Sequence, residues 1–232
     1  MPKPANSPPS ATRRAASRRD TPRNRRDRAR ERTRAALLQA AQRFIVEGRL
    51  HAPILEITQA ADVGLGSFYN HFQSRDALFE AAVDDAPERL GGALDALSAG
   101  LIDPAERFAQ SFRMTSRLFR LEPELMAVAL STGPGVMRAT SGLVPRARRD
   151  LEAGIRAGRF RVTDLDLALA LVVGASLCLC ELLRAQPERD ADVASADAAA
   201  ALLRMLGLAD AEATRVATLP LPATRVGLAA QR

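Results

Sequence analysis

The sequence predicts an all-α protein, and three observations lead to this fold class. Apolar residues recur at intervals of three and four along most of the chain, which is the spacing of one helix face. Helix start and stop signals separate these stretches, and no stretch alternates apolar and polar residues as a half-buried strand does. The 232 residues, 47% of them hydrophobic, suffice for a core in one large domain or two modest ones.

The N-terminal segment carries the positive charge of the chain. Residues 1–34 hold twelve Lys and Arg against three acids, a net +9, whereas the whole chain is +6. This segment has no Leu, Ile, Val or Phe, which argues against a transit peptide because it cannot form an apolar face. We predict a disordered basic arm over residues 1–24. The arm either is a solvated tail or contacts DNA, through phosphates or an A·T-rich minor groove.

Three short helices are predicted next, over residues 25–73. The first begins at Asp27, carries one apolar stripe and ends at Gly48; its stripe residues are Leu37, Ala40, Ala41 and Phe44. The second starts after Pro53, with Ile54, Ile57 and Ala61 on one face. Gly64 and Gly66 are expected to form the turn before the third helix.

The third helix pairs an aromatic face with a polar one. Phe68 and Phe72 are four residues apart and so share one side, which leaves a set of hydrogen-bonding residues for the other. That set is Ser67, Tyr69, Asn70 and His71. A short helix held by two aromatics and presenting a polar face is typical of a helix-turn-helix reader of DNA.

The remaining helices are predicted to form a larger body over residues 74–210. Ser74 caps a helix that reaches Leu97, and Pro87 is expected to kink or split it. Later helices start at Asp103-Pro104 and Glu122-Pro123, and Ser131–Gly135 forms a loop. Three more helices follow: one closed by Gly158, an apolar one from a capping box at 163–166 to near Leu183, and an Ala-rich one over 194–206. Residues 211–232 are predicted to be a tail.

Cysteine usage and hydropathy indicate a cytoplasmic protein. Cys178 and Cys180 are too few and too close for a disulfide framework. Two residues apart on a helix, they point to different sides, and with only two histidines no metal site is expected. The longest apolar run, about Leu167–Cys180, is shorter than a membrane span and is read as a buried helix. No catalytic motif is found, so neither enzyme activity nor a cofactor is expected.

Residues from about Asp27 to Val83 resemble the DNA-binding head of TetR-family transcription regulators. The resemblance rests on four elements in order: Phe44–Gly48, Ile57-Thr58, the run Val63-Gly-Leu-Gly-Ser-Phe-Tyr-Asn-His-Phe72, and Ser74-Arg-Asp-Ala-Leu78. Departures from the family pattern are Ala52 and Pro53 where Thr is frequent, and Gly64 and Leu65 where Ser and Lys are common. The reading face therefore has fewer charged donors than is usual in the family.

The resemblance implies a homodimer that binds operator DNA and a small-molecule effector. By position, Ser67, Tyr69, Asn70 and His71 would face DNA, and Arg75 takes the place of a lysine that commonly meets phosphate. The reading helix has no basic residue, which excludes Arg–guanine readout from it; Asn70 could pair with adenine or phosphate. The last two long helices would form a four-helix bundle with the partner.

A set of aromatic and Met side chains lines either a pocket or the ordinary core. These residues are Phe108, Phe112, Met114, Phe119, Met126, Leu130 and Met137. Arg113 and Arg117 are expected at the surface, with an acidic ligand group as the alternative partner. The sequence thus predicts a ligand-responsive repressor that binds a palindromic operator as a dimer and is released by an apolar or amphipathic effector. The alternatives are a DNA-binding regulator without effector control, and an all-α small-molecule carrier or enzyme.

Overall fold

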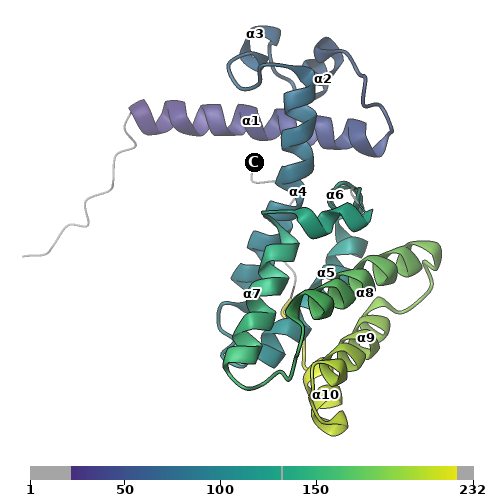
Figure 1. Cartoon of the computed structure of the whole chain (residues 1–232). Helices are drawn as coiled ribbons and strands as arrows, with labels where there is room; N and C mark the ends of the chain where they lie inside the picture. The colour runs from purple at the N-terminus through teal and green to yellow at the C-terminus, as the bar shows by residue number, and fades with distance from the viewer. Residues whose placement is uncertain (1–21, 132, 224–232) are drawn as a thin grey trace, which may run out of the picture.

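The computed structural model describes residues 22–131 and 133–223, and every regular element in those ranges is a helix, so the all-α prediction is confirmed. Figure 1 shows the chain as a small head above a larger helical body. In chain order the helices are α1 (Pro22–Val46), α2 (Ile54–Ala60), α3 (Leu65–Phe68), α4 (Arg75–Ser98), α5 (Pro104–Leu121), α6 (Pro123–Leu130), the 3₁₀ helix η1 (Gly133–Arg138), α7 (Leu143–Arg156), α8 (Leu165–Ala185), α9 (Ala191–Met205) and α10 (Asp210–Ala217).

The head is built around one small apolar cluster. The C-terminal half of α1, with α2, α3 and the start of α4, supplies its side chains. Its buried residues are Leu37, Leu38, Ala40, Ala41, Phe44, Ala52, Ile57, Phe68, Phe72, Leu78, Phe79 and Ala82. All four residues of the predicted α1 stripe belong to it. Gly48, at φ 71°, follows the end of α1, as predicted for a helix C-terminus.

The turn between α2 and α3 differs from the prediction. Its left-handed residue is Asp62, at φ 54°, while Gly64 is extended and Gly66 lies inside α3. Asp tolerates this conformation because its short polar side chain bonds locally. A Cβ added at either glycine would meet nothing within 4 Å, so neither is required by packing. The α-helical part of α3 is only four residues long, and turns continue it to His71.

Helix α4 joins the head to the body. Ser74 is its N-cap as predicted, with Oγ accepting from the backbone N–H of Ala77 at 3.1 Å. Of the two expected effects of Pro87, a kink or a split, the split does not occur: α4 runs through Pro87 as one helix of 24 residues. Its first half packs in the head cluster and its second half in the body cluster, so the predicted boundary at 73/74, which precedes α4, leaves to the body a helix that the head shares.

The body surrounds α5, which packs against α7, α8, α9 and α10. The predicted tail from 211 is wrong in its first part, because α10 packs against α5 and α9 and buries Ala213, Val216 and Ala217. Its eight residues are too few for a clear period in the sequence. Other boundaries shift slightly: α9 begins at Ala191, and α8 is capped by Asp164 alone, whose side chain accepts from the N–H of Leu167 at 3.0 Å.

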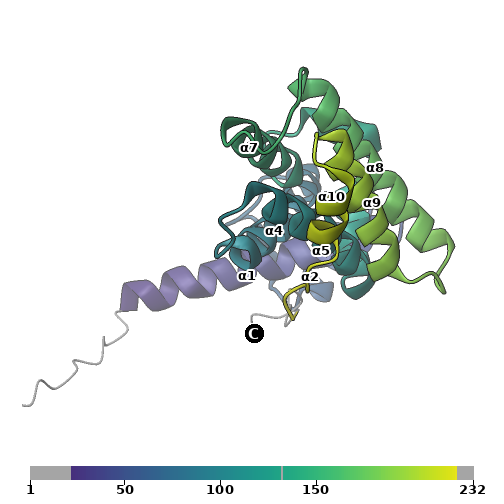
Figure 2. The same ribbon diagram turned by 90° about the horizontal axis from the view of Figure 1, so that it is seen from below.

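Helix α1 begins earlier than predicted. It starts at Pro22 instead of Asp27, so residues 22–24 of the expected arm are helical, and residues 1–21 lie outside the described residues. Arginine is a good helix former, and no Gly or Pro interrupts 23–46. Figures 1 and 2 both show the N-terminal half of α1 projecting beyond the head and the body.

Helix α8 is apolar on two faces. One face packs in the body core, and the other leaves Leu167 57% and Leu171 48% exposed. Among the described residues it is the one helix long and apolar enough to cross a membrane, by length and composition alone. The predicted buried helix is therefore buried on one face within this chain, and its other face is exposed among the described residues.

Candidate nucleic-acid interface and body cavity

The segment 67–72 is anchored by its two phenylalanines. Phe68 is wholly buried and Phe72 nearly so, with ring centroids 6.0 Å apart. On the other side Tyr69 is 59% exposed and Asn70 is exposed, whereas Ser67 and His71 are half-buried. The Tyr69 ring meets the Phe68 ring edge-on, at 5.2 Å between centroids, which holds the exposed phenol against its own anchor. The predicted division into a packing face and a presenting face is thus found in the structure.

Helix α1 supplies cationic groups beside this segment. Ser67, Asn70 and His71 share a polar hollow with Ala29, Arg30 and Thr33 of α1. The Arg30 guanidinium donates to the backbone carbonyl of Asn70 at 3.4 Å, and the Arg34 guanidinium lies 5.5 Å from the centre of the Phe72 ring. Partial burial, with Arg30 and Arg34 nearby, lowers the pKa of His71. The lowered pKa favours the neutral imidazole, which offers both a hydrogen-bond donor and an acceptor.

A second candidate site is an apolar cavity of about 100 Å³ in the body, between α4, α5, α7 and α8. An engineered apolar cavity of ~150 Å³ is known to hold benzene, so this space suits a molecule of about one ring. Its walls are mostly apolar side chains: Leu94, Phe108, Phe112, Val144, Val172, Val173 and Leu177. Phe108 also packs edge-on to Phe160, at 6.0 Å, which fixes one wall.

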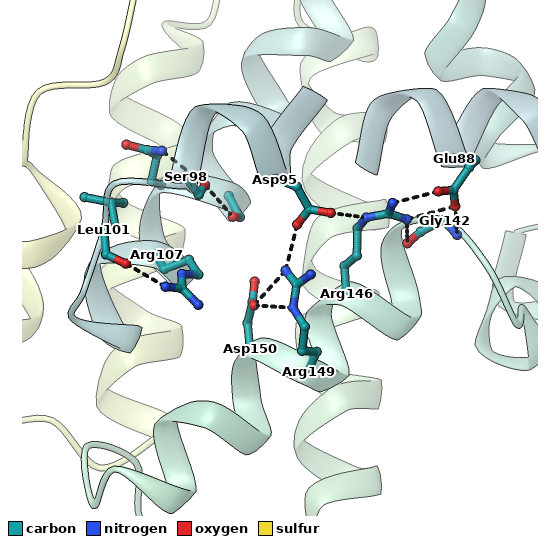
Figure 3. Close-up of polar contacts among 11 residues, drawn as sticks. Glu88, Asp95, Ser98, Leu101, Arg107, Gly142, Arg146, Arg149 and Asp150 are labelled. Carbon is teal, nitrogen blue, oxygen red and sulfur yellow. Dashed lines mark hydrogen bonds and ion pairs between the residues drawn. The ribbon is translucent and has the colours of Figure 1, made fainter. Parts of the chain in front are cut away.

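Two carboxylates and two arginines are part of the cavity lining, and Figure 3 shows their contacts with one another. Asp95 of α4 accepts from Arg146 Nε at 2.7 Å and from Arg149 Nη2 at 2.8 Å. Asp150 of α7, 4% exposed, accepts from Arg149 Nε at 3.1 Å and Nη2 at 3.0 Å, both at the same oxygen, Oδ1. The arrangement leaves carboxylate lone pairs at the edge of an apolar space, where they can accept from hydroxyl groups.

The two carboxyls have opposite pKa shifts. Burial raises the pKa of Asp150, and the hydrogen bonds from Arg149 offset this only in part. Burial also raises the pKa of Asp95, but hydrogen bonds from Arg149 and Arg146 outweigh it and the net pKa is lowered. Asp95 is therefore the carboxylate held firmly ionised, and Asp150 is the one whose charge is least compensated.

Arg146 links the cavity to the upper part of α4. Besides Asp95, it donates to Glu88 at 2.7 and 2.9 Å and to the backbone carbonyl of Gly142 at 2.8 Å. The N–H of Gly142 donates to the same Glu88 carboxylate at 2.9 Å. The hydrogen bonds from Arg146 and Gly142 lower the pKa of Glu88 to about 2. These contacts, visible in Figure 3, fasten the start of α7 to α4.

Two family models match the chain over most of its length. Residues 37–82 match the model described as bacterial regulatory proteins, tetR family, and residues 103–219 match the tetracyclin repressor-like C-terminal domain. The second match spans half of the chain. The chain belongs to the TetR family. The head and body just described are the two parts that these family models cover.

Solved structures agree with this assignment. RolR in complex with the ligand resorcinol is 39% identical, over 85% of this chain and 98% of that one, with a TM-score of 0.61. RolR without ligand gives 36% identity, 82% and 98% coverage, and the same TM-score. An uncharacterized HTH-type transcriptional regulator of Mycobacterium tuberculosis is 34% identical over 101 residues, which are 43% of this chain. The match spans 50% of that relative's own length.

The TetR-family position predicted for a phosphate contact, Arg75, lies at the start of α4. Its side chain is 32% exposed and donates to Asp76 at 3.0 and 2.9 Å and to the carbonyl of His51 at 3.5 Å. These are surface contacts, which a phosphate can replace at little cost. The DNA contacts of Ser67, Tyr69, Asn70, His71 and Arg75 stay predictions.

The aromatic and Met set divides between cavity and core. Phe108 and Phe112 line the cavity, while Phe119 and Met137 border a more open apolar groove along α8. Met114 and Met126 are wholly buried core residues, and the side chain of Leu130 lies outside the described residues.

Sequence reasoning missed the polar part of the cavity lining and misplaced one arginine. A usable signal existed: Asp150 falls on the helix row of Leu143, Ala147 and Gly154, where an apolar residue is expected. Arg113, expected at the surface, is 7% exposed and donates to the carbonyl of Leu219 at 2.6 Å, because the segment after α10 covers it. Arg117 does lie near the surface, paired with Asp192.

Cys178 is exposed and Cys180 is buried, on different sides of α8 as predicted. Burial raises the pKa of the Cys180 thiol to about 12, so it is inert at neutral pH. Among the described residues no group of three or more His, Cys, Asp or Glu is placed to hold a metal ion.

Proposed function

We propose that this TetR-family regulator is a repressor controlled by a small hydroxylated aromatic molecule. It binds a palindromic operator as a homodimer and leaves it when the effector fills the body cavity. The observation that carries the proposal is the apolar cavity with two carboxylates in its lining. The chain's 39% identity to RolR, solved with resorcinol, supports the same class of effector.

The effector class follows from the size and chemistry of the cavity. A volume of about 100 Å³ suits one aromatic ring. The apolar walls would cover the ring faces, and Asp95 and Asp150 would accept from hydroxyl groups on its edge. A hydrogen bond to a charged partner contributes about 1.5–3 kcal/mol, so these carboxylates would select hydroxylated rings over plain ones.

DNA binding is assigned to the exposed side of segment 67–71. Tyr69 and Asn70 would reach base edges or phosphates in the major groove, with Ser67 and His71 beside them and Arg75 on the backbone. The reading helices of a helix-turn-helix dimer must lie about 34–36 Å apart to enter successive grooves. The exposed apolar face of α8, with α9, would pack against its counterpart in the partner and set this spacing.

A chain of contacts connects the cavity to the head. Arg146 lines the cavity and also donates to Glu88 of α4. Closer to the N-terminus of α4, the carbonyl of Ala82 and the carboxylate of Asp85 accept hydrogen bonds from the side chain of Gln42, a buried residue of α1, at 3.1 and 3.2 Å. An effector hydroxyl bound to Asp95 would compete with Arg146 and Arg149. The effector releases DNA if it binds more tightly to a conformation in which α4 is displaced and the two heads no longer have the spacing that DNA requires.

Localisation in the cytoplasm fits this role, since operator DNA is there. The relatives matched are DNA-binding regulators and not enzymes. A DNA-binding regulator without effector control is the alternative, in which the body would serve for dimerisation alone.

Resorcinol titration of the purified protein tests the proposal. We expect saturable heat by calorimetry and a raised melting temperature, and release of DNA fragments previously selected by the protein from a random pool. Asp150→Asn should weaken resorcinol binding by about 10–100-fold. Asp84→Asn, a matched change on the exposed side of α4, should leave it unchanged. DNA selection that succeeds while resorcinol, catechol and phenol all fail to bind would favour the alternative without effector control.

A further inference from the structure

The face of α1 that packs in the head continues past the head as a basic row. Phe44, Ala41 and Leu37 are buried in the head cluster at spacings of three and four. The same spacing continues toward the N-terminus to Thr33, Arg30 and Arg26. The row therefore changes from apolar to cationic at the point where the head stops covering it.

This row begins beside the candidate reading face, which is the exposed side of residues 67–71. Arg30 and Thr33 line the same hollow as Ser67, Asn70 and His71, and Arg30 donates to the Asn70 carbonyl. Arg26 lies one helical turn farther out, about 6 Å along the axis. Residues 25–30 are all exposed, and Figures 1 and 2 show this part of α1 projecting freely to one side.

The acids of this segment are not on the row. Asp27 and Glu31 are one residue further along than Arg26 and Arg30, and each residue turns the helix by about 100°. Arg28 and Arg32 lie on the outer side, where Arg32 Nε donates to the carbonyl of Arg28 at 3.3 Å. Asp27 lies beside the row, three positions before Arg30, but the row itself carries only positive charge on the side of α1 where residues 67–71 are.

We propose that Arg26 and Arg30 bind the phosphates of double-stranded DNA that flank the sequence read by Tyr69–His71. The inference rests on the proposed function and deepens it, because it lengthens the DNA footprint outward from each half-site. Continuity with the reading face and charge complementarity select DNA as the occupant. Because α1 is a helix and not a loose arm, the two guanidinium groups are held about one turn apart before DNA arrives.

Salt titrations of full-length protein compare Arg26→Gln with Arg32→Gln. Both changes remove one positive charge from an exposed position of α1, but only the first lies on the row. We expect Arg26→Gln to make the slope of log affinity against log salt shallower by about 0.9, and to weaken binding about five- to tenfold near 0.1 M salt. Arg32→Gln should stay within twofold of the wild type, and circular dichroism should show equal helicity for all three.

A trimmed duplex locates the contact. When the DNA ends at the half-site and has no flanking phosphates, Arg26→Gln and the wild type should bind with the same slope. Equal slopes for both on long DNA would overturn the inference, as would equal losses for Arg26→Gln and Arg32→Gln, which would mean a net-charge effect only. Failure of the proposed function looks different: the wild type would then show no preference for selected over scrambled DNA, while the salt slopes could still be compared.

Discussion

Phe68 and Tyr69 are neighbours with opposite roles, so exchanging each for Ala separates folding from DNA reading. Phe68 is wholly buried in the head cluster, between the rings of Tyr69 and Phe72. Tyr69 is 59% exposed and its ring meets the Phe68 ring in an edge-to-face contact. Phe68→Ala should therefore unfold the head, whereas Tyr69→Ala should leave it folded and abolish operator binding.

The expected destabilisation by Phe68→Ala follows from the burial of its side chain. A wholly buried Phe→Ala change costs about 3–5 kcal/mol, through lost transfer energy and the cavity left behind. The head has only twelve buried apolar residues, so this is a large share of the ~5–15 kcal/mol typical of a domain. For a unit of roughly 60 residues the loss corresponds to a fall of about 12–40 °C in Tm. Tyr69→Ala, at an exposed site, should change stability by about 0.5 kcal/mol or less.

Thermal denaturation followed by circular dichroism, together with a mobility-shift assay on selected DNA, measures both effects. We expect Phe68→Ala to lose part of its helical signal at lower temperature and Tyr69→Ala to melt like the wild type without shifting DNA. His71→Ala should behave like Tyr69→Ala. The assignment of this face is refuted if folded Tyr69→Ala and His71→Ala bind the operator as tightly as the parent.

Three further predictions concern the body. Glu88→Gln should remove a pH-dependent part of the stability: the folded pKa is lowered from 4.5 to about 2, so the contribution of the pair with Arg146 is present above pH 4.5 and is lost as pH falls toward 2. Gly142→Ala should destabilise the protein by about 1–3 kcal/mol from its φ of 82° alone. The added Cβ would also lie 2.5 Å from Pro87 and increase this cost. The loss of stability is measured as a lower denaturation midpoint. Leu171→Glu should convert the dimer to a monomer in analytical ultracentrifugation, since it charges the exposed face of α8.

Two of these predictions have a matched control. Gly92→Ala lies in α4 with no atom within 4 Å of the added Cβ, and should stabilise by about 0.5–1 kcal/mol through helix propensity. Leu50→Glu is equally exposed, at 51%, but lies in the head, and should stay dimeric. Because half of the Glu88 side chain is exposed, the expected difference in stability between Glu88→Gln and the wild type is modest. Stability–pH curves of the two proteins that overlay between pH 5 and 2 would contradict a pH-dependent contribution of the Glu88–Arg146 pair.

The sequence alone determined the features that depend on neighbours along the chain. Helix periodicity placed Leu37, Phe44 and Phe68 in a head cluster, and the Ser74 cap was predicted from its residue type and position. The side of the reading segment that carries Tyr69 and Asn70 followed from a spacing of four between two phenylalanines. Such features are local because one helical turn spans about four residues.

Only the tertiary structure decided what depends on distant segments. Asp95 and Asp150 are 55 positions apart in the sequence, and α4 and α7 bring them into the lining of one cavity. The burial of Arg113 depends on the segment after α10, and the basic row gains its meaning because the fold brings residues 67–71 beside α1. A charged residue is a surface residue by default; its place in a site is set by the helices that close around it, and no local pattern records which helices those are.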